Sequence, residues 1–325
     1  GGCLWHSFDH QRGYHPDPFY GGVMDVFRQP KYAYYMFKAQ RSPEKQDRLF
    51  ETGPMVYIAH EMTPFSPKDV TVYSNCDEVR LTYNKGGKTW TYTKPATKEG
   101  MPSPVITFKD IYDFMIDKNM SMRKKKQDEV FLLAEGIIDG KVVATHEVRP
   151  ARRPEKVLLW VDNENTDLKA DGSDFVTVVA AVADKNGNIK RLNNYYVKFH
   201  VEGEGRLLGD ASILANPAPV KWGTAPVLIQ STLKPGKIKV IASVLFEGSQ
   251  MPTSAVLELE SVLTEHPLLY SEKEAVLISS ASATGLGGTT VKSAAELEQE
   301  RLQKEQNMQK LKEVEQQQED FGEKK

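Results

Sequence analysis

Apolar and polar residues alternate along much of the chain with a period of two, which is typical of half-buried strands. Between residues 54 and 150 this pattern predicts strands at Met55–Met62, Val70–Asn75, Glu78–Asn84, Thr89–Tyr92, Val130–Ile138 and Lys141–Val148. Asp139-Gly140 joins the last two, and this dipeptide is a strong hairpin signal because both central residues of the turn take positive φ. Residues 54–150 are therefore predicted to form an all-β sandwich.

A second set of alternating runs follows between residues 151 and 262. It predicts strands at Val157–Val161, Asp174–Ala183, Tyr195–Val201, Val227–Leu233 and Lys237–Phe246. Turn signals separate them, the clearest at Lys185–Asn188 and Lys234–Gly236. Short strands at this spacing over about 100 residues are typical of an immunoglobulin-like sandwich. The fold class is therefore mainly β, with two sandwich domains.

The first 42 residues follow another pattern. Gly1–His10 has the character of a buried strand that ends in polar and ring-bearing residues, as barrel enzymes present a sugar or phosphate site. Pro30 suits a first helical turn, and a helix is predicted after it from apolar residues at Tyr34, Met36, Phe37 and Ala39. The polar residues 43–53 are predicted to be a linker.

The end of the chain is polar. Residues 263–292 are predicted to be a second linker because they include a Ser, Thr and Gly-rich stretch. Ser293 to Glu296 fits a helix capping box, so residues 293–325 are predicted to form a charged helical tail. Its apolar residues form a broken heptad, which favours a solvated tail over a coiled coil and leaves a homo-oligomer open.

Composition narrows the classes of partner. At about 150 residues per domain, 325 residues suggest two or three domains. A net charge of -2 gives no long-range field to attract nucleic acid or an anionic membrane, and Arg123–Lys126 is predicted to be a solvated loop between strands. No apolar run approaches the ~20 residues that span a bilayer. Cys3 and Cys76 fall in different predicted domains, so neither a disulfide framework nor a zinc site is predicted.

Several runs of residues together point to one family. Gly1-Gly2-Cys3-Leu4-Trp5-His6-Ser7-Phe8-Asp9 fits a Gly-Gly-x-x-Trp-x-x-x-Asp pattern, and Gly22 to Lys31 fits Gly-x-x-Asp-x-x-x-x-Pro-Lys. With Val72–Val79 and Ala170–Val176 in addition, residues 1–260 resemble glycoside hydrolase family 2, the β-galactosidase and β-glucuronidase family.

The resemblance implies an organisation and an activity. Residues 1–42 would be the final βα unit of a (β/α)8 barrel, and the sandwiches would be domains that trail the barrel and brace it. The parent protein would be a retaining exo-glycosidase with a nucleophile and an acid/base about 5–5.5 Å apart. In the family both are glutamates on earlier barrel strands, and the first glutamate here is Glu44, so the isolated chain is expected not to hydrolyse glycosides.

The resemblance also implies substrate-binding residues at the end of the first predicted strand. Trp5 matches the family tryptophan that lies under the apolar face of the sugar, and Asp9 matches the aspartate four residues later. Asp9 has two open roles, a hydrogen bond to a sugar hydroxyl or support of a loop. His6 and His10 fall on the opposite side of the strand and are either rim donors to a longer or anionic substrate or solvent-facing loop residues.

Two groups of His and Asp residues could hold a metal ion, but each has a simpler explanation. His6, His10 and His15 with Asp9 and Asp17 have no compact ligand spacing, so hydrogen bonding is favoured over zinc. Turn capping is favoured over calcium for the acidic stretch made of Asp162, Asp167, Asp171 and Asp174. No cofactor is predicted for this chain, although family members that bind magnesium or sodium beside the sugar leave either ion open for the parent enzyme.

The alternative to a piece of an enzyme is a carbohydrate-binding or adhesive module without catalysis. Its best support is a set of aromatic residues able to form a flat platform, Trp90, Tyr92, Trp160 and Trp222. Burial of all four would disfavour it. Both interpretations predict a carbohydrate partner. The identity of the sugar and the compartment stay open, with a periplasmic or secreted bacterial location favoured by the resemblance.

Overall fold

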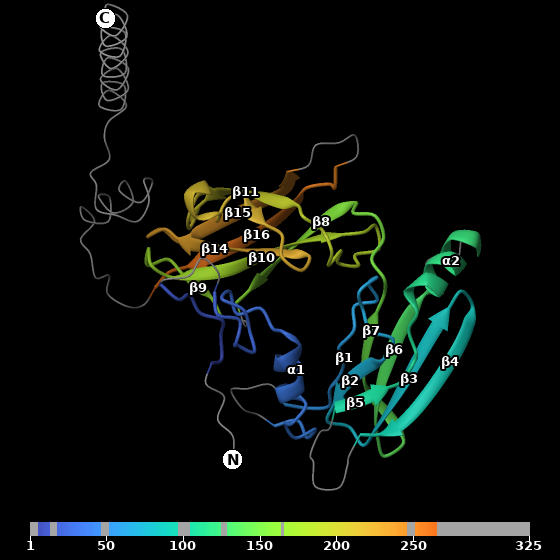
Figure 1. The fold of residues 1–325 in the computed structure, drawn as a ribbon. Coiled ribbons are helices and arrows are strands. Elements are labelled where there is room, and N and C mark those ends of the chain that lie inside the picture. Colours follow the sequence, from blue (N-terminus) through green and yellow to red (C-terminus); the bar gives the residue numbers. More distant parts are fainter. Residues whose placement is uncertain are drawn as a thin grey trace, which may run out of the picture.

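The computed structural model describes residues 6–13, 18–46, 52–96, 105–124, 129–163, 166–245 and 251–264. Strands dominate this part of the chain and form four sheets, whereas the α-helices are α1 (Tyr32–Lys38) and α2 (Phe114–Lys124) (Figure 1). The mainly β fold predicted from the alternation is thus confirmed. No helix within the described ranges is long and apolar enough to cross a membrane. The predicted tail, residues 293–325, lies outside them.

The first sandwich consists of two sheets that share one core. Its strands are β1 (Val56–Ile58), β2 (Val70–Ser74), β3 (Glu78–Lys85), β4 (Lys88–Pro95), β5 (Val105–Phe108), β6 (Phe131–Ile138) and β7 (Lys141–Val148). A sheet of order β4-β3-β6-β7 faces a sheet of order β1-β2-β5. Val70 and Val72 from one sheet and Leu81 and Leu132 from the other meet in this core, where each is fully buried.

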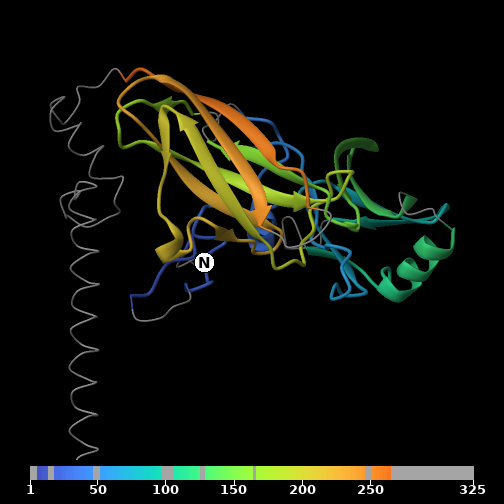
Figure 2. The same ribbon diagram turned by 90° about the horizontal axis from the view of Figure 1, so that it is seen from above.

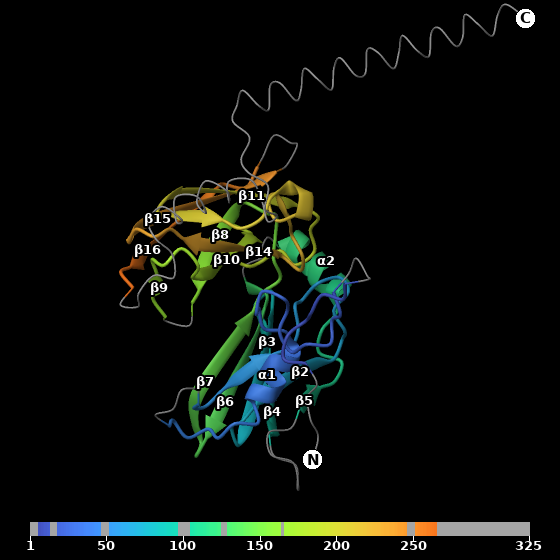
Figure 3. The same cartoon turned by 90° about the vertical axis from the view of Figure 1, so that its left-hand side faces the viewer.

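The second sandwich is larger. Its elements are β8 (Lys156–Asp162), β9 (Leu168–Lys169), β10 (Phe175–Ala183), β11 (Tyr196–Gly203), β12 (Gly205–Leu207), the 3-10 turn η2 (Ala211–Ile213), β13 (Ala218–Pro219), β14 (Thr224–Ser231), β15 (Gly236–Leu245) and β16 (Ala255–Val262). The sheets have the orders β12-β14-β10-β8 and β13-β11-β15-β16-β9. Figures 2 and 3 show them packed face to face, and Val178, Ile229, Ile238 and Val240 form the centre of the core between them.

The predicted hairpin at Asp139-Gly140 is confirmed. Asp139 has φ 51° and Gly140 has φ 72°, and Ile138 pairs with Lys141 across the turn. These positive values match the twist of the flanking strands, which is why Asp-Gly is favoured there. The two strands this turn joins, β6 and β7, have the bounds that the alternation predicts to within one residue.

Residues 6–46 lie between the two sandwiches, with α1 against β2 (Figure 3). The strand predicted over Gly1–His10 differs from the structure, because its described part forms isolated bridges, Phe8 with Met24 and His10 with Phe19, in place of a ladder. The placement of Pro30 in a first helical turn is also wrong. The helix starts at Tyr32, and Pro30 instead bridges Met24 in an extended stretch.

The all-β prediction for residues 54–150 needs one correction. Helix α2 interrupts the sandwich and lies at its outer end, beyond β3 and β4 (Figures 1 and 2). Its polar anchor is Asp117, which pairs with Lys85 at the end of β3. Arg123 and Lys124 therefore belong to the last turn of a helix and not to a loop between strands.

Candidate functional site

Asp9 is the best-defined of the predicted site residues. Its side chain is buried, and Oδ1 accepts hydrogen bonds from the Gly22 backbone N–H at 3.0 Å and from Lys31 Nζ at 2.6 Å. Only glycine fits at position 22, because a Cβ there would lie 2.2 Å from the Phe8 carbonyl carbon. The carboxylate thus ties the first segment to the loop before α1, so of its two open roles the geometry favours loop support.

His6 and His10 lie together on the surface of the same segment. Their ring centroids are 4.4 Å apart, and both rings contact Phe19, at 5.4 and 5.3 Å. The Arg12 guanidinium lies over the Phe19 ring, 4.1 Å from its centroid. Desolvation, and then the charges of His10 and Arg12, lower the pKa of His6. Of the two histidines, His10 is exposed and His6 is half-buried, so His10 is the one at the surface of the cluster.

Three predicted residues lie outside the described residues, Trp5, His15 and Asp17. Within the described ranges, no three His, Cys, Asp or Glu side chains come together closely enough to hold a metal ion. The magnesium or sodium that the resemblance leaves open for the parent enzyme stays a prediction.

The acidic stretch of the second sandwich forms capped turns. Asp171 Oδ1 accepts the backbone N–H groups of Ser173 and Asp174, each at 2.7 Å. Although burial alone would raise it, these N–H groups lower the pKa of Asp171. Asp162 instead accepts a hydrogen bond from Gln29 Nε2 at 2.8 Å, which joins the N-terminal segment to β8. Turn capping thus accounts for Asp171, and Asp162 holds the segment in place.

A partly buried polar junction connects α1 to both sandwiches. Glu61, in the loop after β1, accepts hydrogen bonds from Tyr32 OH on α1 and from Arg191 Nε in the second sandwich, each at 2.9 Å. The Arg191 and Glu61 side chains are 25% and 14% exposed. Burial, and then the Glu61 charge, raise the pKa of Tyr32 above its ordinary value, so the phenol stays protonated and donates.

An aromatic stack continues the junction into the first sandwich. Tyr35 and Tyr57 lie parallel, with centroids 3.6 Å apart and planes 5° apart, and His146 packs on Tyr57 at 4.5 Å. Within the junction, Glu61 and Arg191 lie 130 positions apart in the chain. No local pattern predicts such contacts, so the sequence gives no sign of Glu61 or Arg191 as functional residues.

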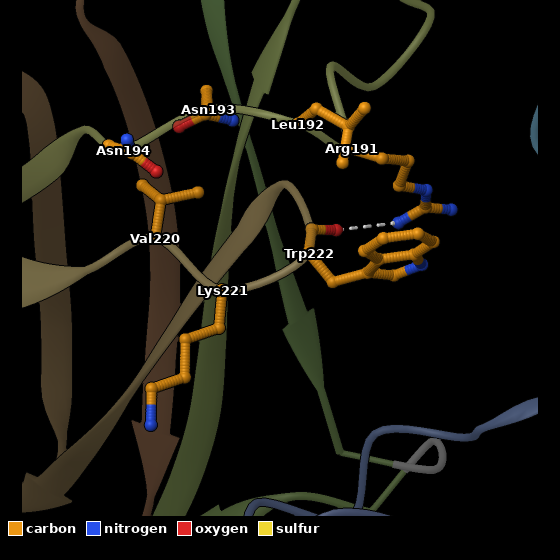
Figure 4. Close-up of a pocket in the computed structure, with 7 residues that line it drawn as sticks. All are labelled: Arg191, Leu192, Asn193, Asn194, Val220, Lys221 and Trp222. Carbon is orange, nitrogen blue, oxygen red and sulfur yellow. Dashed lines mark hydrogen bonds between the residues drawn. The ribbon is translucent and has the colours of Figure 1, made fainter. Parts of the chain in front are cut away.

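Arg191 also borders an open cavity of about 560 Å³ in the second sandwich (Figure 4). Its Nη1 donates to the Trp222 carbonyl at 3.2 Å, and Figure 4 shows the indole beside the guanidinium. Trp222 has φ 52°, in the left-handed region that bulky residues rarely take, and 53% of the residue is exposed. Asn194 and Lys221 supply polar groups to the same cavity. An exposed ring with nearby donors can bind a polar ligand with an apolar face.

The burial of all four platform residues, which would disfavour a carbohydrate-binding module, is not observed. Trp90 and Tyr92 are 39% and 38% exposed on β4, and Trp222 is exposed as described above, whereas Trp160 is half-buried in β8. The exposed rings lie in two places, Trp90 and Tyr92 on the first sandwich and Trp222 on the second.

Comparisons with known proteins point to one family. A family model described as glycoside hydrolase family 2 C-terminal domain 5 matches residues 159–245, which run from β8 to the end of β15. A β-galactosidase of Thermoanaerobacter pseudethanolicus is 32% identical over 246 residues, covering 73% of this chain and 31% of the relative. A β-galactosidase of Thermoanaerobacterium thermosulfurigenes is 30% identical over 192 residues, covering 58% of this chain and 26% of the relative. The chain thus spans less than a third of the length of these relatives.

A solved structure agrees in fold. The crystal structure of a β-glycosidase from Bacteroides vulgatus matches with a TM-score of 0.57 and 24% sequence identity. The match covers 79% of this chain and 30% of that chain. At this identity it shows that most of this chain shares the fold of one part of a larger protein.

Proposed function

We propose a function from the premise that this chain belongs to glycoside hydrolase family 2 and is a C-terminal portion of such a protein. In this proposal the whole protein is a retaining exo-glycosidase of the β-galactosidase type. In this proposal residues 1–42 supply the final βα unit of the catalytic barrel, and the two sandwiches brace it. The two carboxyl groups that act as nucleophile and acid/base, about 5–5.5 Å apart in retaining enzymes, come from elsewhere in the whole protein. The partner is a carbohydrate substrate, and no step depends on a metal held by this chain.

The observation that carries the proposal is the junction of Tyr32, Glu61 and Arg191. It ties α1, which follows the segment of the predicted site, to both sandwiches through hydrogen bonds of 2.9 Å. Hydrogen bonds to a charged group contribute about 1.5–3 kcal/mol each, and partial burial limits screening by water. The sandwiches therefore hold α1 in a fixed position, as a brace requires.

Trp5 is the residue of this chain that we assign to the substrate. An indole offers a flat apolar surface that the C–H groups of a pyranose can cover, with little side-chain freedom to lose. Asp9 has a positioning role in this assignment, because its carboxylate is already engaged by Gly22 and Lys31. The residues that distinguish one sugar from another would lie on the other strands of the barrel, so the sugar itself is not assigned.

The first test concerns the substrate residue. Kinetics on nitrophenyl β-galactoside and on nitrophenyl glycosides of other sugars would compare the intact protein with its Trp5→Ala variant. Loss of a stacking surface that contributes about 1.5 kcal/mol should lower kcat/KM roughly tenfold or more. The present chain, assayed without the rest of the protein, should show no turnover above a buffer blank. Unaltered kinetics in Trp5→Ala, or turnover by this chain, would contradict the proposal.

The second test concerns the brace. Glu61→Ala in the intact protein should lower kcat/KM and the temperature of inactivation, because α1 loses its hydrogen-bonded link to Arg191 of the second sandwich and keeps only the Tyr35–Tyr57 stack to the first. Glu135→Ala is the matched control, since Glu135 pairs with Arg80 at 2.7 Å within the first sandwich and away from the junction. Equal effects of the two substitutions would remove the bracing role.

A further inference from the structure

The inner face of β4 carries an uncovered pair of aromatic residues. Trp90 pairs with Tyr83 and Tyr92 pairs with Leu81 across the ladder, and residues directly opposite each other point to the same face of a sheet. Tyr83 and Leu81 are 3% and 0% exposed in the core, yet Trp90 and Tyr92 are each more than a third exposed. The facing sheet has three strands against four, and its cover of β4 is partial, since Phe108 of β5 lies beside Tyr92 while both rings of β4 stay more than a third exposed.

Each of these rings has one side packed against the core. The Trp90 centroid lies 6.0 Å from that of Tyr83, and the Tyr92 centroid lies 6.4 Å from that of Phe108. Both partners are buried. The rings are thus fixed against the core while part of each remains open to water, which is the state of an aromatic side chain prepared to receive a ligand.

The rings border a cavity of about 370 Å³, within the range of about 300–1,000 Å³ that small-molecule sites occupy. Its walls come from β3, β4, the turn after β5 and the start of α2, and the polar groups there include Lys85, Asp110, Tyr112 and Asp113. Asp69 fixes the turn, since its carboxylate accepts the Asp110 N–H at 3.0 Å and pairs with Lys109 at 2.6 Å. The aromatic and polar groups therefore meet on a rigid frame.

Both lysines of this cavity are paired with carboxylates, and Asp110 adds a further carboxylate that forms no ion pair with the described residues. Lys85 lies 2.9 Å from Asp117 Oδ1, the other oxygen of Asp117 accepts a hydrogen bond from Tyr83 OH, and Lys68 lies 3.9 Å from Asp113. The Lys85 and Asp117 side chains are 10% and 7% exposed. Because each lysine has a carboxylate beside it, the cavity has no net attraction for an anion. Its chemistry suits a neutral ligand with an apolar face and many hydroxyls.

We infer that this surface of the first sandwich, built on Trp90 and Tyr92, binds a neutral saccharide chain. The inference rests on the proposed function for the choice of ligand class, and it adds a second place where this chain meets carbohydrate. The two rings take the C–H faces of sugar units, and Lys85, Asp110 and Asp113 exchange hydrogen bonds with their hydroxyls. The site holds a glycan without cleaving it.

Isothermal titration calorimetry on the full 325-residue chain tests this inference. The probes are three neutral tetrasaccharides, β-1,4-galactotetraose, cellotetraose and mannotetraose, with tetragalacturonate as the anionic counterpart. We expect binding of at least one neutral probe and weaker binding of the anionic one. Trp90→Ala and Tyr92→Ala should each weaken that binding roughly tenfold or more. Phe175→Ala, which removes an exposed ring from β10 of the other sandwich, should leave it unchanged.

Further variants separate loss of a contact from loss of fold. Trp90→Phe keeps a flat ring, so it should retain affinity within a few-fold while losing the change in tryptophan fluorescence that the ligand causes in the parent chain. The inference is overturned if no neutral probe binds, if tetragalacturonate binds more tightly, or if Trp90→Ala and Phe175→Ala have equal effects. It is also overturned if binding seen with this chain disappears in the intact protein, because another segment would then cover β4.

The outcome is independent of catalysis. Calorimetry on this chain needs no hydrolysis, so loss of binding with glycosidase activity intact in the whole protein removes the inference and leaves the proposed function. Binding by this chain together with no glycosidase activity in the whole protein leaves the inference and removes the proposed function.

Discussion

The first sandwich sets a four-stranded sheet against a three-stranded one, whereas in the second a four-stranded sheet faces a five-stranded one. The consequence shows in the burial of single strands. In β15 of the second sandwich every other residue from Ile238 to Val244 is buried, while all eight residues of β4 in the first sandwich are exposed. Both strands alternate in sequence. What differs is whether a facing sheet covers the inward side.

The two sandwiches also close their cores with different chemistry. The core of the second consists of aliphatic residues and Phe199, and a buried polar side chain beside it, Asp184, accepts hydrogen bonds from backbone N–H groups. The first places a buried polar group at its overhanging end, where Asp117 of α2 meets Lys85 and Tyr83 of β3. A binding surface can therefore arise at low cost where one sheet outgrows its partner, because the side chains of the extra strand already point inward.

The largest effect is expected when the buried polar group is broken. Asp117→Ala leaves the Lys85 ammonium and the Tyr83 hydroxyl buried without their acceptor, which should destabilise the first sandwich by about 3–5 kcal/mol. Hydrogen exchange of the β3 and β6 amides should accelerate accordingly, while exchange in β10 and β15 stays as it was.

A double variant sharpens this test. Lys85→Met with Asp117→Leu replaces the ion pair by apolar groups of similar size, and such replacements are often neutral or stabilising. It should recover most of the lost protection. Asp113→Ala is the control, since the Asp113 side chain is 33% exposed and its pair with Lys68 is at 3.9 Å. If Asp113→Ala costs as much as Asp117→Ala, the buried pair has no special role.

A smaller effect is expected from one added methyl group in the first core. A Cβ at Gly136 of β6 would lie 2.5 Å from Cys76 Sγ and 3.5 Å from Val56 Cβ, so Gly136→Ala overpacks the site and should cost about 1–3 kcal/mol. Adding Cys76→Ala removes the nearest atom and should restore part of the stability. Gly13→Ala, where no atom lies within 4 Å, is the matched control. Urea unfolding of the parent chain, Gly136→Ala, Cys76→Ala and the double variant measures the coupling, and additive effects would show that the two positions do not meet.

Much of the fold could be predicted from the sequence, because strand alternation and the Asp-Gly turn are local signals. The coverage of β4 could not, since its pattern of alternate residues is the same whether or not a sheet lies opposite. Helix α2 was missed for a related reason. Phe114, Met115 and Ile116 are consecutive, and of its apolar residues only Ile116 and Met120 are spaced by three or four, so the helical period is weak.

The site divides in the same way. The motif that contains Asp9 marks a real position in the fold, but its hydrogen bonds to Gly22 and Lys31 depend on a loop whose path no local pattern describes. The Glu61 to Arg191 contact joins residues 130 positions apart. The role of Trp5 as a sugar platform stays a prediction, because the residue lies outside the described ranges.

The smallest effect, and the one that separates the sandwiches most cleanly, is expected from pH. Burial lowers the pKa of His60 and of His146 in the first sandwich, although the Glu61 charge near both acts in the opposite direction. His60 Nδ1 accepts the Met62 N–H at 3.1 Å, and His146 Nδ1 accepts the Ile58 N–H at 3.1 Å, so both rings are needed neutral. A histidine whose pKa in the folded state lies below the unfolded value of about 6.5 makes its full contribution to the free energy of unfolding above pH 6.5. This contribution is lost as the pH falls through the folded-state pKa. The loss is about 1.4 kcal/mol per pKa unit for each ring.

The stability of the second sandwich should not change between pH 7.5 and 5.5. The lowered pKa values of Asp171 and Asp184 start from 3.8, so their contribution is lost only at more acidic pH. Hydrogen exchange at pH 7.5 and 5.5, corrected for the intrinsic rates, should therefore show a loss of protection in β3 and β6 with little change in β10 and β15. His146→Gln should reduce the pH dependence, and His200→Gln, at an exposed position of β11, should not. Equal losses in both sandwiches would mean that the neutral rings do not set the pH response, and that the difference between the two cores lies in their packing.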